Sequence, residues 1–278
     1  MTATTTFQIG GDLRVRRLGF GAMHLPAAPE PDRANALAVA RRAVELGVTL
    51  IDTAYLYGWG ANEELLAEAL HPYPADLLLT TKVGVARPKG EGVLDGRPET
   101  LRAQVDAALG RLRTERIELL QLHRVDPEIP LADQVGALRE LRTAGKIARI
   151  GLSEVTVAQL AEARTITDIA SVQNRYNLLD REHEPVLAAC EKARIAFLPW
   201  RPVAWGAAGV RAEIAAVAAD ADATPTQVAL AWLLGHSPVI CPIPGTASLD
   251  HLAENMAADA LRLTPDQRDR LDWLREED

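Results

Sequence analysis

Short apolar runs alternate with amphipathic stretches along most of this chain. The apolar runs are bounded by Gly, Pro and polar residues, a pattern typical of buried strands. They predict strands over residues 18–23, 48–52, 77–83, 117–122, 147–152, 170–174, 195–198 and 239–243. Between them, apolar side chains recur at helical spacing, which predicts helices over 62–70, 98–112, 131–144, 157–164, 184–193 and 224–234. A further helix begins where Asp32 is expected to cap it and ends at Gly47.

The order of these elements predicts the fold class. Eight strands, each followed by a helix, within about 250 residues indicate an α/β fold of the (β/α)8 TIM-barrel type. Residues 7–17 predict a short N-terminal β-hairpin that plugs one end, and residues 265–274 a C-terminal helix. The alternative is an open doubly wound sheet, but its Gly-x-Gly-x-x-Gly turn is missing after the first strand. We expect one domain over residues 1–278.

Polar side chains stand at the ends of consecutive predicted strands. In a parallel barrel these ends share one rim, where active sites lie. The residues at that rim are Asp52 and the nearby Tyr57, Lys82, His123, Ser153 and Gln173. Each residue alone could have a purely structural role, such as a helix cap for Asp52 or an ordinary core histidine for His123. Four ionisable residues from three consecutive strand ends favour a catalytic site.

The four ionisable residues suit one kind of chemistry. A lysine ammonium beside a buried tyrosine favours the phenolate, so Lys82 is expected to lower the pKa of Tyr57 from about 10. Asp52 would keep that lysine charged and in place. Tyr57 would then act as a general acid, while His123 donates a hydrogen bond to a substrate oxygen. A proton donor without a nucleophile or a metal cluster suits carbonyl reduction by a cofactor's hydride.

Composition and charge limit the cellular compartments and binding partners that we expect for this protein. The net charge of −8 argues against nucleic-acid binding, and no apolar run approaches the length of a membrane helix. Cys190 and Cys241 have no closely spaced partner, which predicts two reduced core cysteines. The first residues lack the pattern of a signal peptide, so we expect a cytoplasmic protein; the oligomeric state is not readable.

Several motifs carry a resemblance to a known family over nearly the whole chain. In order, they are Asp52-Thr-Ala-x-x-Tyr57-Gly, Thr81-Lys82-Val, Leu122-His123-Arg-Val-Asp126, Gly145-Lys-Ile-x-x-Ile-Gly-Leu-Ser153, Gln173-Asn-x-Tyr-Asn177 and a final segment, Ile243-Pro-Gly through Glu254-Asn255. The chain resembles the aldo-keto reductases, barrel enzymes that use a nicotinamide cofactor. The resemblance implies that Tyr57 is the general acid, tuned by Lys82 and Asp52, and that His123 orients the substrate.

The same resemblance implies the cofactor contacts. Ser153 and Gln173 match the positions that bind the nicotinamide carboxamide, and Trp200 the aromatic residue on which the ring stacks. Glu254 and Asn255 match the pair that binds adenine. Glu154 stands where the family commonly has Asn; a carboxylate could also accept from the nicotinamide amide, so we expect this departure to be tolerated.

The adenine end departs from the family pattern. NADP-specific members carry basic residues where this chain has Gly245 and His251. That leaves Thr246, Ser248, His251 and the following helix N-terminus to hold a 2′-phosphate. NADPH is the expected cofactor, and NADH is the alternative that the sequence leaves open.

Other functions remain open from the sequence. Lys82 could be a Schiff-base nucleophile, as in an aldolase, although the neighbouring Asp52 favours a charged lysine. The chain could also be a cofactor-binding redox sensor with slow turnover. A metal-dependent hydrolase would need clustered ligands that the sequence lacks.

The substrate is expected to be a small carbonyl compound. Trp59, Trp200 and Trp205 could line an apolar pocket for aromatic or medium-chain substrates, next to a functional loop over residues 84–97. Arg111, Arg113, Arg116 and Arg124 are expected to be solvated charges.

Overall fold

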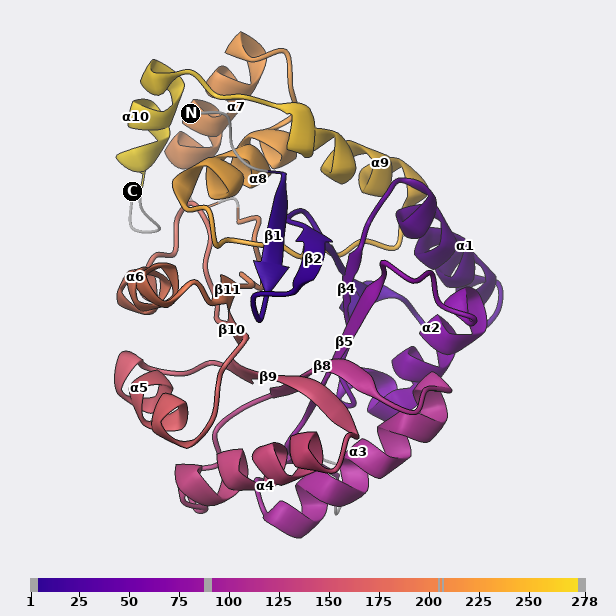
Figure 1. The fold of residues 1–278 in the computed structure, drawn as a ribbon. Helices are drawn as coiled ribbons and strands as arrows, with labels where there is room; N and C mark the ends of the chain where they lie inside the picture. Colours follow the sequence, from indigo (N-terminus) through magenta and orange to yellow (C-terminus); the bar gives the residue numbers. More distant parts are fainter. Residues whose placement is uncertain (1–4, 88–91, 205, 207, 275–278) are drawn as a thin grey trace.

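Parallel strands form the centre of the molecule in the computed structural model, which describes residues 5–87, 92–204, 206 and 208–274. Over these residues, seven strands curl into one sheet in the order β11-β10-β9-β8-β5-β4-β3 (Figure 1). The strands are β3 (Phe20–Gly21), β4 (Leu50–Asp52), β5 (Leu78–Val83), β8 (Ile117–Leu122), β9 (Ile147–Ser153), β10 (Ser171–Gln173) and β11 (Ala196–Phe197). All of their pairings are parallel, as a barrel of β/α units requires.

The eighth predicted strand is present as an extended segment rather than a regular strand. Residues 239–244 lie between β11 and β3, where the Cys241 amide donates to the Phe197 carbonyl at 2.7 Å. On the other side, the Gly19 and Gly21 amides donate to the carbonyls of Pro242 and Pro244 at 2.9 and 3.1 Å. Because prolines have no amide proton, this segment cannot complete a ladder. It still closes the ring, so the barrel prediction is confirmed while the strand assignment over 239–243 is wrong.

Helices surround the sheet on its outer face (Figure 1). They are α1 (Asp32–Glu45), α2 (Ala61–Leu70), α3 (Pro98–Leu112), α4 (Leu131–Thr143), α5 (Val157–Ile166), α6 (Glu184–Ala193), α7 (Ala208–Asp220), α8 (Pro225–His236), α9 (Leu249–Ala257) and α10 (Pro265–Asp272). The pattern missed α7, whose buried Val210, Ile214 and Val217 are diluted by alanines. Asp32 is the first helical residue and makes no cap, because Pro31 occupies the N-cap position.

A hairpin of β1 (Thr6–Ile9) and β2 (Leu13–Arg16) closes the end of the barrel where the strands begin (Figure 1). Ile9 is fully buried there against Leu50, Leu78 and Leu119, which point inward from three strands. A second small hairpin, β6 (Val85–Ala86) with β7 (Val93–Leu94), follows β5 at the opposite end. The predicted plug is therefore confirmed, and the open rim is the C-terminal one.

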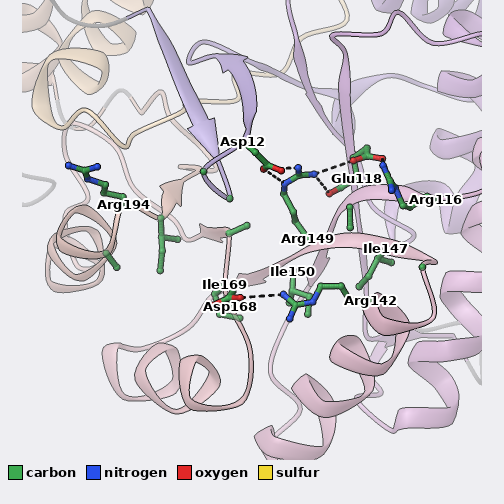
Figure 2. Close-up of a pocket in the computed structure, with 17 residues that line it drawn as sticks. Asp12, Arg116, Glu118, Arg142, Ile147, Arg149, Ile150, Asp168, Ile169 and Arg194 are labelled. Carbon is green, nitrogen blue, oxygen red and sulfur yellow. Dashed lines mark hydrogen bonds and ion pairs between the residues drawn. The ribbon is translucent and has the colours of Figure 1, made fainter.

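The plugged end carries a cavity of about 750 Å³ whose lining combines glycines, alanines and isoleucines with several charged side chains. Figure 2 shows Arg149 reaching between Asp12 and Glu118, at 2.7 and 3.1 Å. These charges pair with one another, and they link the hairpin turn to β8 and β9. We assign them to the stability of this end, because they leave little free charge for a ligand.

Cys190 and Cys241 are both buried free thiols, as predicted. Burial raises the pKa of each thiol to about 12. Neither is therefore a reactive thiolate at neutral pH.

Candidate active site

The four predicted ionisable residues meet at the C-terminal rim of the barrel. Asp52 is the last residue of β4, Lys82 lies near the end of β5, and His123 directly follows β8. Tyr57 begins the short 3₁₀ helix η2 (Tyr57–Gly60), which brings its ring back over the end of β5. Parallel register explains this convergence, since β4, β5 and β8 are adjacent in the sheet.

Lys82 is the centre of the group and is fully buried. Its Nζ donates to Asp52 Oδ2 at 2.6 Å, to the Thr53 carbonyl at 2.8 Å and to the Tyr57 hydroxyl at 3.3 Å. Burial opposes the charged form, but the Asp52 carboxylate and the Tyr57 hydroxyl outweigh it and raise the pKa of Lys82. The lysine is thus a charged ammonium, which does not suit a Schiff-base nucleophile.

Tyr57 corrects one part of the sequence prediction. Burial raises the pKa of its phenol above 10, and the opposing effect of Lys82 does not reverse this. The sequence could not reveal this balance, because it depends on how deeply the ring is buried. Tyr57 therefore keeps its proton in the free protein, the state that a general acid needs.

His123 faces Tyr57 across the site, with ring centroids 6.2 Å apart and planes nearly perpendicular. Burial, together with the positive charges of Lys82 and Arg124, lowers the pKa of His123 to about 2. A neutral imidazole still carries one N–H, so His123 can donate a hydrogen bond without taking part in proton transfer.

We expect His123 to make the protein sensitive to acid. Its pKa is lowered from 6.5 to about 2 in the folded chain, so below pH 6.5 only the unfolded chain binds this proton. Stability therefore falls as the pH falls, by about 1.4 kcal/mol per unit, or about 2 kcal/mol at pH 5. Urea unfolding at pH 7 and pH 5 measures this loss. His123→Asn should lose about 2 kcal/mol less than wild type; an equal loss in the two proteins would contradict the assignment.

Asp52 has two further partners, one of which the sequence reasoning missed. Its Oδ1 accepts from Gln121 Nε2 at 3.1 Å and from Gln173 Nε2 at 2.9 Å. Gln121 is the one amide in the apolar run of β8, and that isolated polar residue was the available signal. The amides fix the carboxylate, so Gln173 holds Asp52 while its carbonyl oxygen is left for other contacts.

A cavity of about 850 Å³ opens above these residues. Its lining includes Asp52, Tyr57, His123, Gln173 and Trp200 together with Gly245, Thr246, His251, Glu254 and Asn255. Trp59 does not line it, and Trp205 lies outside the described residues, as do residues 88–91 of the predicted functional loop. Most of the predicted site residues thus line one cavity, whereas Lys82, Ser153 and Ser248 do not.

Glu154 has a role that the sequence did not reveal. Its Oε1 accepts from the indole Nε1 of Trp200 at 2.5 Å and from the Arg175 amide at 2.7 Å. The residue has a φ of +54°, a left-handed backbone conformation. Its carboxylate therefore orients the indole, and the expected tolerance of a carboxylate beside the nicotinamide stays a prediction.

Ser153 lies behind the cavity wall. Its side chain is almost fully buried, and its Oγ accepts from Arg124 Nη1 at 3.1 Å. Because the hydroxyl accepts from the guanidinium, its own proton is free to be donated. Ser153 is absent from the cavity lining, unlike Gln173 and Trp200.

The segment leading into α9 contributes part of the cavity lining. Gly245, Thr246, His251, Glu254 and Asn255 line it, whereas Ser248 caps the helix by accepting from the His251 amide at 3.3 Å. Glu254 accepts from the Thr224 hydroxyl at 2.5 Å. A Cβ on Gly245 would lie 2.7 Å from the Gly21 carbonyl. This close approach explains why no basic side chain stands at position 245.

The part of the chain that the structure describes offers neither a metal-ligand cluster nor a membrane-spanning helix. Within residues 5–87, 92–204, 206 and 208–274, no group of three or more His, Cys, Asp and Glu is placed to bind a metal ion. In the same part of the chain, none of the helices has the length and apolar character needed to cross a membrane.

Known proteins share both sequence and fold with this chain. The model of the Aldo/keto reductase family matches residues 17–276. An uncharacterized oxidoreductase of Schizosaccharomyces pombe is 42% identical over 94% of this chain and 87% of its own length. Pyridoxine 4-dehydrogenase of Escherichia coli is 38% identical over 99% of this chain and all of its own. An aldo-keto reductase of Klebsiella pneumoniae, solved with NADP and acetate, superposes with a TM-score of 0.85 at 26% identity, over 98% of this chain and 96% of that one.

Proposed function

The chain belongs to the aldo/keto reductase family, and from that premise we propose that it reduces an aldehyde or ketone to an alcohol, with NADPH as the hydride donor. The single observation that carries this proposal is the buried ammonium of Lys82, held between the Asp52 carboxylate and the Tyr57 hydroxyl. That arrangement provides a general acid at the wall of a cavity that also offers an aromatic face for a cofactor.

The cavity fits a dinucleotide. Its lining includes Tyr57, Trp200 and Asn255, and it offers an indole, amides and hydroxyls to a ligand. We propose that Trp200, Gln173 and Ser153 hold the nicotinamide end and that Gly245, Thr246, Ser248, His251, Glu254 and Asn255 hold the adenine end. When bound, the nicotinamide supplies a hydride to the substrate carbon.

The chain's own residues supply the proton and the orientation. Tyr57 keeps its phenol proton until the carbonyl oxygen gains negative charge, and then transfers it to that oxygen. Lys82 stabilises the phenolate left behind, and Asp52 keeps the lysine charged. His123, as a neutral N–H donor, orients the carbonyl oxygen toward Tyr57.

We propose an aromatic aldehyde as the substrate. Met23, Leu56, Trp200, Val203 and Ile243 give the cavity apolar walls, which suit a flat ring. The relative named pyridoxine 4-dehydrogenase acts on an aromatic alcohol, and its 38% identity extends over its full length. Pyridoxal, the aldehyde of that alcohol, is therefore the first substrate to test.

Titration of the purified protein with NADPH and separately with NADH, following tryptophan fluorescence, tests the cofactor. Quenching at micromolar NADPH, with weaker binding of NADH, would support phosphate contacts from the Thr246–His251 part of the cavity. Equal affinity would mean that a site with Gly245 and His251 does not discriminate between NADPH and NADH. Failure of both to bind would contradict the proposal.

Multiple turnover separates the enzyme from the redox sensor. An enzyme reduces many equivalents of pyridoxal or 4-nitrobenzaldehyde, while a sensor binds the cofactor tightly and turns over slowly. We favour the enzyme, because a sensor has no need of all four rim residues. Cytoplasmic location and one domain over residues 1–278 are part of the same proposal.

A further inference from the structure

Arg124 does not lie where its sequence context suggested. It was expected to be a solvated charge, but it is half-buried and lines the cavity beside Tyr57 and His123. Its positive charge favours a lower pKa for both residues. For His123 this is the third-largest cause of the lowered pKa, after burial and the charge of Lys82. Arg124 is therefore part of the electrostatic environment in which the carbonyl is reduced.

Both side-chain hydrogen bonds of Arg124 are made by one nitrogen of its guanidinium, Nη1. Nη1 donates to the His123 carbonyl at 2.6 Å and to Ser153 Oγ at 3.1 Å. A guanidinium has five N–H groups in a planar fork, so most of its donors are not used by these two contacts. Among the described residues, no carboxylate forms an ion pair with it.

The loop that carries Arg124 is fixed by hydrogen bonds. The Asp126 carboxylate accepts from the Gly96 amide at 2.9 Å and from the Glu128 amide at 3.0 Å. The Gln134 side chain accepts from the Asp126 amide at 3.0 Å and donates to its carbonyl at 2.9 Å. The guanidinium is consequently presented from a rigid support, which lowers the cost of binding a ligand.

The charges at this end of the cavity do not cancel. Lys82 and Asp52 neutralise each other as an ion pair at 2.6 Å, and His123 is neutral because its pKa is lowered to about 2. Glu254, which also lines the cavity, accepts from the Thr224 hydroxyl, and Arg201 adds a second cation to the lining. Arg124, which forms no ion pair among the described residues, therefore adds a positive charge that acts on Tyr57.

We propose that Arg124 binds an anionic group of the substrate. The preferred substrates are then carbonyl compounds that carry a carboxylate or another oxyanion away from the reacting carbonyl. A guanidinium fork matches a carboxylate in geometry, and the half-buried position strengthens the pair. This inference rests on the proposed function and adds the substrate class to it. The arginine acts in recognition, while the proton still comes from Tyr57.

Two substrates of nearly equal shape test the inference: 4-carboxybenzaldehyde and its methyl ester, with the 3-carboxy pair to vary the position of the charge. Their kcat/KM values are compared in wild type and in Arg124→Gln. We expect the variant to lose about 10- to 100-fold in kcat/KM for the acid, mainly in KM, and little for the ester. Arg124→Lys should keep part of the preference for the acid, and a thermal melt shows that each variant is folded.

The control variant is Arg194→Gln, which removes the same charge from an exposed position at the plugged end (Figure 2). It should keep the wild-type ratio of acid to ester. An equal loss for acid and ester in Arg124→Gln, together with weaker NADPH binding, would mean that Arg124 serves the cofactor through Ser153 and would overturn the inference.

A binding measurement separates this inference from the proposed function. 4-(Hydroxymethyl)benzoate and its methyl ester are titrated calorimetrically into wild type and Arg124→Gln with NADP⁺ present. Binding of the acid that depends on Arg124 would support the inference even if wild type reduced no aldehyde, a result that would overturn the reductase alone. Binding of the acid that is equal in both proteins would overturn the inference alone.

Discussion

Tyr57→Phe is expected to abolish most carbonyl reduction while leaving cofactor binding nearly unchanged. The substitution removes only the hydroxyl, which lies 3.3 Å from Lys82 Nζ and is the proposed proton donor. A positioned general acid contributes about 10²–10⁴ to the rate, so kcat should fall by that factor. Steady-state kinetics with pyridoxal or 4-carboxybenzaldehyde gives the loss, and fluorescence titration with NADPH gives the affinity.

The matched control for this variant is Tyr55→Phe. Tyr55 lies two residues earlier in the same loop and packs its ring on Trp59 and on the Arg111 guanidinium, contacts that phenylalanine keeps. It should retain nearly full activity. Parallel loss of NADPH binding and turnover in Tyr57→Phe would show that the ring, rather than its proton, is needed, and would refute the assignment.

Lys82→Met should remove turnover and also weaken the fold. Asp52 would stay buried without its ammonium, and breaking a buried ion pair from one side costs about 3–5 kcal/mol. Lys82 also lowers the pKa of Tyr57, so its removal raises that pKa further. Alcohol oxidation needs the phenolate, so any residual oxidation should require a higher pH than in wild type. Denaturant unfolding and the pH profile of alcohol oxidation measure the two effects.

A double variant separates stability from chemistry. Asp52→Asn combined with Lys82→Met replaces the unpaired carboxylate with a neutral amide, so most of the lost stability should return. Turnover should not return, because nothing then stabilises the phenolate of Tyr57. Recovery of turnover along with stability would mean that Lys82 acts only through the fold.

The fold could be predicted from the sequence because each strand and most helices carry a regular apolar pattern. The deviations have identifiable physical causes. Pro242 and Pro244 cannot donate to a ladder, so the last strand is only an extended segment. In α7 the alanines dilute the stripe formed by Val210, Ile214 and Val217.

The four rim residues were also predictable, since strand order and parallel register place them together. Their protonation was not. The pKa of Tyr57 depends on how deeply the ring is buried. That depth is set by the backbone of η2 and by residues that are distant in the sequence. Likewise, the left-handed backbone at Glu154 determines where its carboxylate points, and no residue pattern announces that conformation.

The hydrogen bond from Trp200 to Glu154 determines when the indole becomes ordered. A free aromatic side chain in a wide cavity would sample several rotamers, and selecting one on ligand binding costs about 0.5–1.5 kcal/mol. Here the carboxylate, itself fixed by the Arg175 amide, selects that rotamer as the chain folds. The conformational entropy of the ring is thus lost once per folding event instead of once per catalytic cycle. A flat ligand that enters and leaves at every turnover meets a surface that is already in place.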